Sequence, residues 1–203
     1  VYIANHGAQH FHLGSIADVK GQDLPSASLA WASFPCQDLS LAGLTEGIHA
    51  ARSGLVWQWL RIIDEMYAPP PLLVAENVAG LVSAAGGSHY RTLHQALAER
   101  GYIVGAMLID AVHWVPQSRP RVFVVAVKAD AKIPIGLTSP GPTWLHPEAV
   151  CKAAAGVDGW VWWNMPAPST RRQTLSDIVE WDAAFANSEA EARNIRLISP
   201  KHA

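Results

Sequence analysis

The chain has 203 residues, of which 50% are hydrophobic and 16% are charged, and its formal net charge is −2 at pH 7. This length corresponds to one domain, or to one domain and part of a second, and the apolar share excludes a wholly disordered protein. Two cysteines, Cys36 and Cys151, exclude a disulfide framework and a four-cysteine zinc site, and they fit a reducing cytoplasm. The near-neutral charge excludes a globally basic nucleic-acid-binding protein, and no apolar run approaches the roughly 18 residues of a membrane span.

Apolar patterning predicts strands that alternate with helices along the chain. Residues 1–6 read as the end of a helix, which Gly7 terminates. Because the chain starts within this helix, we expect it to be a fragment of a longer protein. The predicted strands are 12–17, 28–34, 71–78, 103–112 and 121–128, and the predicted helices are 55–67 and 90–100. This alternation predicts an α/β fold with a mostly parallel sheet, whose last two strands are antiparallel because their connection is short.

The composition changes after Lys128. Residues 129–173 are rich in proline and contain Trp160, Trp162 and Trp163. We expect these tryptophans to form a small core rather than a platform for stacked bases. The sequence therefore predicts a second, irregular region after the α/β part.

Reactive or charged side chains adjoin three of the predicted strands. Cys36 follows 28–34, Glu76 lies near the end of 71–78, and Arg119 and Arg121 stand at the start of the last strand. Ligand sites in open α/β sheets lie at the carboxyl ends of strands, which makes Cys36 a candidate nucleophile and Glu76 a candidate functional carboxylate. Each has an alternative explanation. Cys36 could be a buried structural cysteine, Glu76 could form an ordinary salt bridge at a strand end, and Arg119 and Arg121 could be the positive charges of a turn.

Taken in order, the three segments resemble signature motifs of the cytosine-C5 methyltransferase family: Pro35-Cys36-Gln37, Glu76-Asn77-Val78 and Gln117-Ser118-Arg119-Pro120-Arg121. The resemblance covers residues 1–128, and 166–179 is also similar to family sequence. It implies a partial Rossmann-like, S-adenosylmethionine-dependent methyltransferase fold. On this basis 1–128 is a partial catalytic domain, and 129–203 is the start of the variable target-recognition region.

The resemblance implies methyl transfer to C5 of cytosine in DNA. A thiolate at Cys36 would add to C6 of a flipped-out base, because this addition makes C5 nucleophilic. Glu76 would act as an acid at N3, and Arg121 would hydrogen-bond O2, with Arg119 in a supporting role. The sequence names no base for the final loss of the C5 proton, and water can take it. The resemblance also implies substrate or DNA contacts by Gln37, Ser40, Asn77 and Gln117, and a loop from Gln37 to about Arg52 that closes over DNA.

S-adenosylmethionine is the cofactor that the resemblance implies, with Ser15, Ile16, Phe34, Pro35 and Leu55 in its site. Ser15 replaces the aspartate of the family's Gly-Asp-Ile, and the family's glycine-rich loop and ribose-binding acid are absent from this sequence. The family strand order is 3-2-1-4-5-7-6, in which 12–17 would be strand 3 and 28–34 strand 4. We therefore expect an unpaired apolar edge at 28–34, poor folding, and neither cofactor binding nor activity in the isolated chain.

Double-stranded DNA is the expected partner, with a cognate restriction endonuclease as a further one. We expect a full-length enzyme that is monomeric, without metal or membrane attachment, in the cytoplasm of a bacterial or phage-infected cell. A tRNA methyltransferase of the same family is one alternative; it is disfavoured because Lys152, not the Phe of that branch's Cys-Phe-Thr, follows Cys151. The others are an inactive nucleic-acid-binding module and a hydrolase that uses Cys36 and His113.

Overall fold

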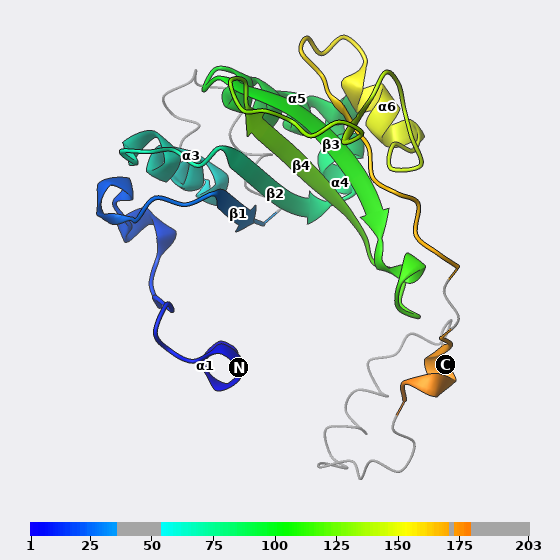
Figure 1. Ribbon diagram of the computed structural model, residues 1–203, viewed down its shortest axis with the longest axis horizontal. Coiled ribbons are helices and arrows are strands. Elements are labelled where there is room, and N and C mark those ends of the chain that lie inside the picture. The colour runs from blue at the N-terminus through cyan, green and yellow to red at the C-terminus, as the bar shows by residue number, and fades with distance from the viewer. Residues whose placement is uncertain (36–53, 171–172, 180–203) are drawn as a thin grey trace.

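A four-stranded sheet forms the centre of the computed structural model, which describes residues 1–35, 54–170 and 173–179 (Figure 1). The strands are β1 (Leu29–Ser33), β2 (Leu72–Val78), β3 (Tyr102–Asp110) and β4 (Pro120–Lys128), in the order β1-β2-β4-β3. β1 and β2 pair in parallel, whereas β4 pairs antiparallel with both β2 and β3. Three strands thus run the same way and β4 is reversed, which confirms the predicted fold class and the 4-5-7-6 part of the expected strand order.

The α-helices are α1 (Tyr2–His6), α3 (Leu55–Glu65), α4 (Gly80–Ser83), α5 (Ser88–Ala98) and α6 (Glu148–Ala154). The helices predicted at 55–67 and 90–100 are present as α3 and α5, and the helix end predicted at 1–6 is α1, whereas α4 and α6 were not predicted. Short 3-10 turns are η1 (Ile16–Asp18), η2 (Gly21–Asp23), η5 (Ala84–Gly87), η6 (Ala111–His113) and η7 (Leu175–Asp177). No helix in the described ranges has the length and apolar character that crossing a membrane would require.

The two faces of β4 belong to two hydrophobic clusters. Val122, Val124 and Ala126 are fully buried in the larger cluster, to which α3, α4, α5 and α6 all contribute (Figure 1). The alternate residues Phe123, Val125 and Val127 point to the opposite face, where they pack against Leu145 and Trp163. The alternation follows from the two-residue period of a strand and gives each face its own cover.

The irregular region packs directly on the sheet. β6 (Trp162–Trp163) pairs with β5 (Thr138–Ser139), and the Trp163 side chain is only 5% exposed. The Trp163 indole N–H donates to the Val125 carbonyl at 3.2 Å. The predicted small core is confirmed for Trp163 alone: Trp160 packs against the larger cluster instead, and Trp162 contacts the rings of His146 and Trp160.

The strand predicted over residues 12–17 is wrong. The segment forms a bend followed by η1, in which the Ser15 hydroxyl accepts a hydrogen bond from the Ala17 N–H at 3.2 Å. The carbonyls of Ile16 and Ala17 face a side chain of α3 rather than a neighbouring strand. Within the described ranges β1 pairs with β2 alone, and Leu29 and Trp31 are 45% and 53% exposed, so the expected apolar edge is present.

Gly105 permits the closest approach between the irregular region and the sheet. A Cβ at this position would lie 2.0 Å from the Val161 carbonyl oxygen and 2.9 Å from the indole nitrogen of Trp163. We predict that Gly105→Ala lowers the free energy of unfolding by about 1–3 kcal/mol, because the packed backbone must move to admit a methyl group. Urea denaturation of the full-length protein that contains this chain measures the loss.

Gly141→Ala is the matched control, since a Cβ there meets nothing within 4 Å. Equal stabilities of the Gly105→Ala and Gly141→Ala proteins would show that the irregular region does not dock on β3 as described.

Candidate active site

Glu76 and Arg121 form an ion pair at the carboxyl end of β2. The Arg121 Nε lies 3.0 Å from the Glu76 Oε1, and the two side chains are 21% and 20% exposed. Arg121 stands opposite Val78 in the antiparallel pairing of β2 and β4, so the start of β4 adjoins the end of β2. The motifs that contain these two residues, more than 40 positions apart in the sequence, therefore meet at one edge of the sheet.

Asn77 fastens the chain that leads to Cys36. Its side chain is 3% exposed, and its Nδ2 donates to the Phe34 carbonyl at 2.9 Å, while its Oδ1 accepts from the Val78 N–H. These contacts hold the residue two positions before Cys36 against the end of β2. Both polar groups of Asn77 therefore serve the protein backbone, and its predicted contact with substrate stays a prediction.

Three of the predicted site residues, Cys36, Gln37 and Ser40, lie outside the described residues. The same holds for the predicted DNA-closing loop, so neither the position of the nucleophile nor its distance from His113 is described. The His113 ring itself contacts the rings of Trp114 and Trp144 edge-on. What the structure does describe is the pair of charged groups and the chain up to Pro35.

Asp110 organises the loop that carries Gln117 and Arg119. Its carboxylate accepts hydrogen bonds from the Val112 N–H at 3.0 Å, the Arg119 N–H at 2.7 Å and the Ser118 hydroxyl at 3.0 Å. The Val112 N–H, followed by the Arg119 N–H, holds the pKa of Asp110 below its ordinary value of 3.8. The Gln117 and Arg119 side chains are exposed, so the loop presents them to solvent.

A cavity of about 460 Å³ adjoins this edge, between β1, α3 and the segment around η1. Four of the five predicted cofactor residues line it, namely Ser15, Ile16, Phe34 and Leu55, whereas Pro35 does not. Its volume falls within the range typical of small-molecule sites. The structure thus gathers residues from three separate segments into one pocket.

Trp31 and Trp59 also line the cavity, and the sequence analysis missed both. Trp59 could have been found, because it lies one helical turn after Leu55 on α3. Aromatic and aliphatic walls fit a flat heteroaromatic ring such as adenine. No acidic side chain is among the lining residues, so the described part offers no carboxylate for a ribose diol. Nor does it contain three His, Cys, Asp or Glu side chains placed to hold a metal ion.

Sequence comparison agrees with the motifs. The chain matches the family described as C-5 cytosine-specific DNA methylase over residues 1–196. It belongs to this family. The match includes all three motifs and extends into the irregular region.

Among similar proteins is the type II methyltransferase M2.BsuMI of Bacillus subtilis, 40% identical over 108 residues, which are 52% of this chain and 28% of the relative. The type II methyltransferase M.MspI of Moraxella is 33% identical over 127 residues, 62% of this chain and 29% of the relative. The chain therefore spans less than a third of the length of these relatives. A DNMT2 mutant of Spodoptera frugiperda shares the fold, with a TM-score of 0.57 at 18% identity over 90% of this chain and 49% of its own.

The lowered pKa of Asp110 yields a prediction about acid stability. A carboxyl whose pKa is lower in the folded state stabilises the protein at neutral pH and ceases to do so as the pH falls through that lowered value. We predict that Asp110→Asn lowers the melting temperature at pH 7, and that this difference shrinks as the pH falls below 3.8, where the carboxyl of the unfolded chain becomes neutral, and vanishes once the pH is below the lowered pKa of the folded state.

Thermal unfolding of the full-length protein at several pH values tests this, with Asp130→Asn at an exposed position as the control. A difference between wild type and Asp110→Asn that does not change with pH would contradict the assigned charge–dipole contacts.

Proposed function

We propose that the protein transfers a methyl group from S-adenosylmethionine to C5 of cytosine in DNA, through an adduct between Cys36 and C6 of a flipped-out base. The observation that carries the proposal is the contact between Glu76 and Arg121, beside the backbone that Asn77 holds at Phe34. This places a carboxyl and a guanidinium next to the chain that enters the Pro-Cys-Gln motif. The family assignment supports the same chemistry.

The free atoms of the ion pair suit one edge of cytosine. Among the described residues, Glu76 Oε2 and Arg121 Nη2 have no hydrogen-bond partner, while Oε1 and Nε face each other. Cytosine presents adjacent acceptors at N3 and O2, and a protonated carboxyl beside a guanidinium offers two donors. Negative charge develops on this edge when a thiolate adds to C6, so donors placed there stabilise the transition state.

The reaction balances without a metal or a redox step. The Cys36 sulfur bonds to C6, Glu76 supplies a proton to N3, and C5 becomes an enamine carbon that attacks a methyl group. Bound S-adenosylmethionine would supply that methyl group from its sulfonium, and S-adenosylhomocysteine, a neutral thioether, would be the leaving group. Loss of the C5 proton to water and expulsion of Cys36 regenerate the thiolate, and return of the N3 proton to the Glu76 carboxylate restores the acid and gives 5-methylcytosine.

The cavity beside β1 is the proposed cofactor site. Ile16, Leu55 and Trp59 give it apolar walls, and Phe34 links it to the chain that leads to Cys36. Ser33 lines the same cavity and is the register partner of Glu76. The proposed methyl donor and the proposed catalytic pair would therefore lie on either side of the end of β1.

Double-stranded DNA is the proposed substrate, since the similar bacterial proteins are named type II methyltransferases. Arg119, exposed on its loop, would then face a phosphate or the closed loop. A restriction endonuclease as a cellular partner, action in the cytoplasm and a monomeric enzyme are further parts of this proposal.

Cys36→Ala is predicted to abolish covalent trapping. With duplex DNA that contains 5-fluorocytosine, the full-length enzyme and cofactor should form an adduct stable to denaturant, because fluorine cannot leave as a proton does. Gel electrophoresis in denaturant measures the adduct. The control is Cys151→Ala, a half-buried cysteine that donates to the His146 carbonyl and should trap normally. Trapping by the Cys36→Ala protein would rule out this nucleophile.

Glu76→Gln is predicted to slow methylation by at least about a hundredfold, because loss of a general acid typically costs roughly 10²–10⁴ in rate. Incorporation of labelled methyl groups measures the rate, and a gel-shift assay should show DNA binding close to that of wild type. Glu148→Gln, on the surface of α6, is the control, since its only described ion pair is with Lys152. Near-normal turnover of Glu76→Gln would exclude the proposed acid.

A further inference from the structure

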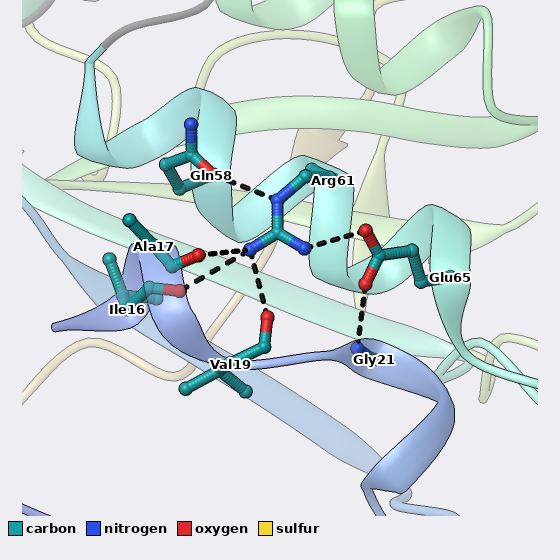
Figure 2. A network of polar contacts seen from close by, with 7 residues as sticks. All are labelled: Ile16, Ala17, Val19, Gly21, Gln58, Arg61 and Glu65. Atoms are coloured by element: carbon teal, nitrogen blue, oxygen red, sulfur yellow. Dashed lines mark hydrogen bonds and ion pairs between the residues drawn. The ribbon is translucent and has the colours of Figure 1, made fainter. Parts of the chain in front are cut away.

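One side chain of α3 binds a segment that has no place in the sheet. The Nη2 of Arg61 contacts the carbonyl oxygens of Ile16, Ala17 and Val19 at 3.4, 3.3 and 2.8 Å (Figure 2). The Nε of the same guanidinium donates to the Gln58 side chain at 2.8 Å. One guanidinium thus binds three backbone carbonyls of residues 15–21. We call this segment the strap.

Glu65 makes a second attachment one helical turn further along α3. Its Oε1 pairs with Arg61 Nη1 at 2.6 Å, and its Oε2 accepts from the Gly21 N–H at 2.8 Å (Figure 2). The Gly21 N–H and then the Arg61 guanidinium lower the pKa of Glu65. The two side chains together bind η1 and the residue at the start of η2.

The strap lies too close to α3 for any residue other than glycine at position 21. A Cβ on Gly21 would lie 2.1 Å from the Ile62 carbonyl oxygen and 2.7 Å from the Glu65 Cβ. Gly21 is buried against the helix as a result. This close approach is independent of the polar contacts, and it indicates the same fixed spacing between strap and helix.

The strap and α3 form two walls of one cavity. Ser15 and Ile16 line it from the strap, and Leu55 and Trp59 line it from α3. Since no strand of the described sheet pairs with the strap, hydrogen bonds to Arg61 and Glu65 take the place of a β-ladder. The distance between the two walls therefore depends on side chains that do not themselves line the cavity.

We propose that Arg61 and Glu65 are positioning residues, which hold the strap against α3 at the spacing that the adenosine part of the cofactor requires. This inference rests on the proposed cofactor site. A guanidinium suits the task because its planar set of donors can contact three carbonyls, an amide and a carboxylate at once. A lysine ammonium keeps the charge but cannot reach these partners together.

Arg61→Lys in the full-length protein is the main test. We expect hydrogen–deuterium exchange in the strap to rise by about tenfold or more and the affinity for S-adenosylhomocysteine, measured by calorimetry, to fall by about tenfold or more, because several charge-assisted hydrogen bonds are lost. The KM for S-adenosylmethionine should rise more than kcat falls. Exchange within α3 should stay unchanged, since its helical hydrogen bonds remain.

Arg100→Lys is the matched control. Arg100 also binds α3, through two hydrogen bonds to Asp64 at 2.8 and 2.7 Å, but it does not touch the strap. The Arg100→Lys variant should show hydrogen–deuterium exchange in the strap and an affinity for S-adenosylhomocysteine equal to those of wild type. Gly21→Ala, which displaces the strap without altering charge, should reproduce the effects of Arg61→Lys and keeps the test open if that variant misfolds.

The outcomes separate this inference from the proposed function. If wild type binds S-adenosylhomocysteine and both strap variants bind it equally well, the positioning role is wrong while the proposed function stands. If wild type does not bind it at all, the proposed cofactor site is wrong, and the positioning role is overturned with it. A loosened strap together with weaker binding, and normal behaviour of Arg100→Lys, supports the inference.

Discussion

β2 has a parallel neighbour on one side and an antiparallel neighbour on the other. This pairing determines where the proposed catalytic groups lie. Parallel pairing with β1 brings the chain that enters the Pro-Cys-Gln motif to the end of β2 that carries Glu76. Antiparallel pairing with β4 makes that strand begin where β2 ends, so Arg121 meets Glu76. At about 3.3 Å per residue, a parallel β4 would leave its first residues roughly 20 Å away at the other end of β2.

The end of β1 joins this catalytic edge to the proposed cofactor pocket. Ser33 faces the cavity and pairs with Glu76, and Phe34 lines the cavity while its carbonyl accepts from Asn77. A methyl donor and a nucleophile must approach the same cytosine from nearby positions, and a shared strand end provides this proximity without a long connecting loop. The opposite wall of the pocket depends instead on the polar contacts of Arg61 and Glu65.

Much of this arrangement could be predicted from the sequence because its signals are local. The spacing of apolar residues predicted α3, α5 and four strands, and the short motifs singled out Glu76 and Arg121, which the structure shows to be in contact. The strand at 12–17 failed because a strand needs a neighbour, and the strap instead satisfies three of its carbonyls at Arg61. No local pattern marks a cation that binds backbone carbonyls more than 40 positions away.

The sequence also could not predict the close approaches at Gly21 and Gly105. Each position needs glycine only because a backbone segment distant in sequence packs against it. Asp110 could have been recognised as the last residue before the Arg119 loop, but its three hydrogen bonds depend on how that loop turns. Cys36 remains a prediction from its motif and from the position of Phe34.

Methylation of cellular DNA tests the central claim most directly. The full-length gene should be expressed in a host that lacks cytosine methylation, and the DNA then analysed by bisulfite sequencing and by mass spectrometry of its nucleosides. The account predicts 5-methylcytosine within a defined sequence context for wild type, and none above background for Cys36→Ala. Absence of 5-methylcytosine with the soluble wild-type protein, or a methyl group on N4 instead of C5, would contradict it.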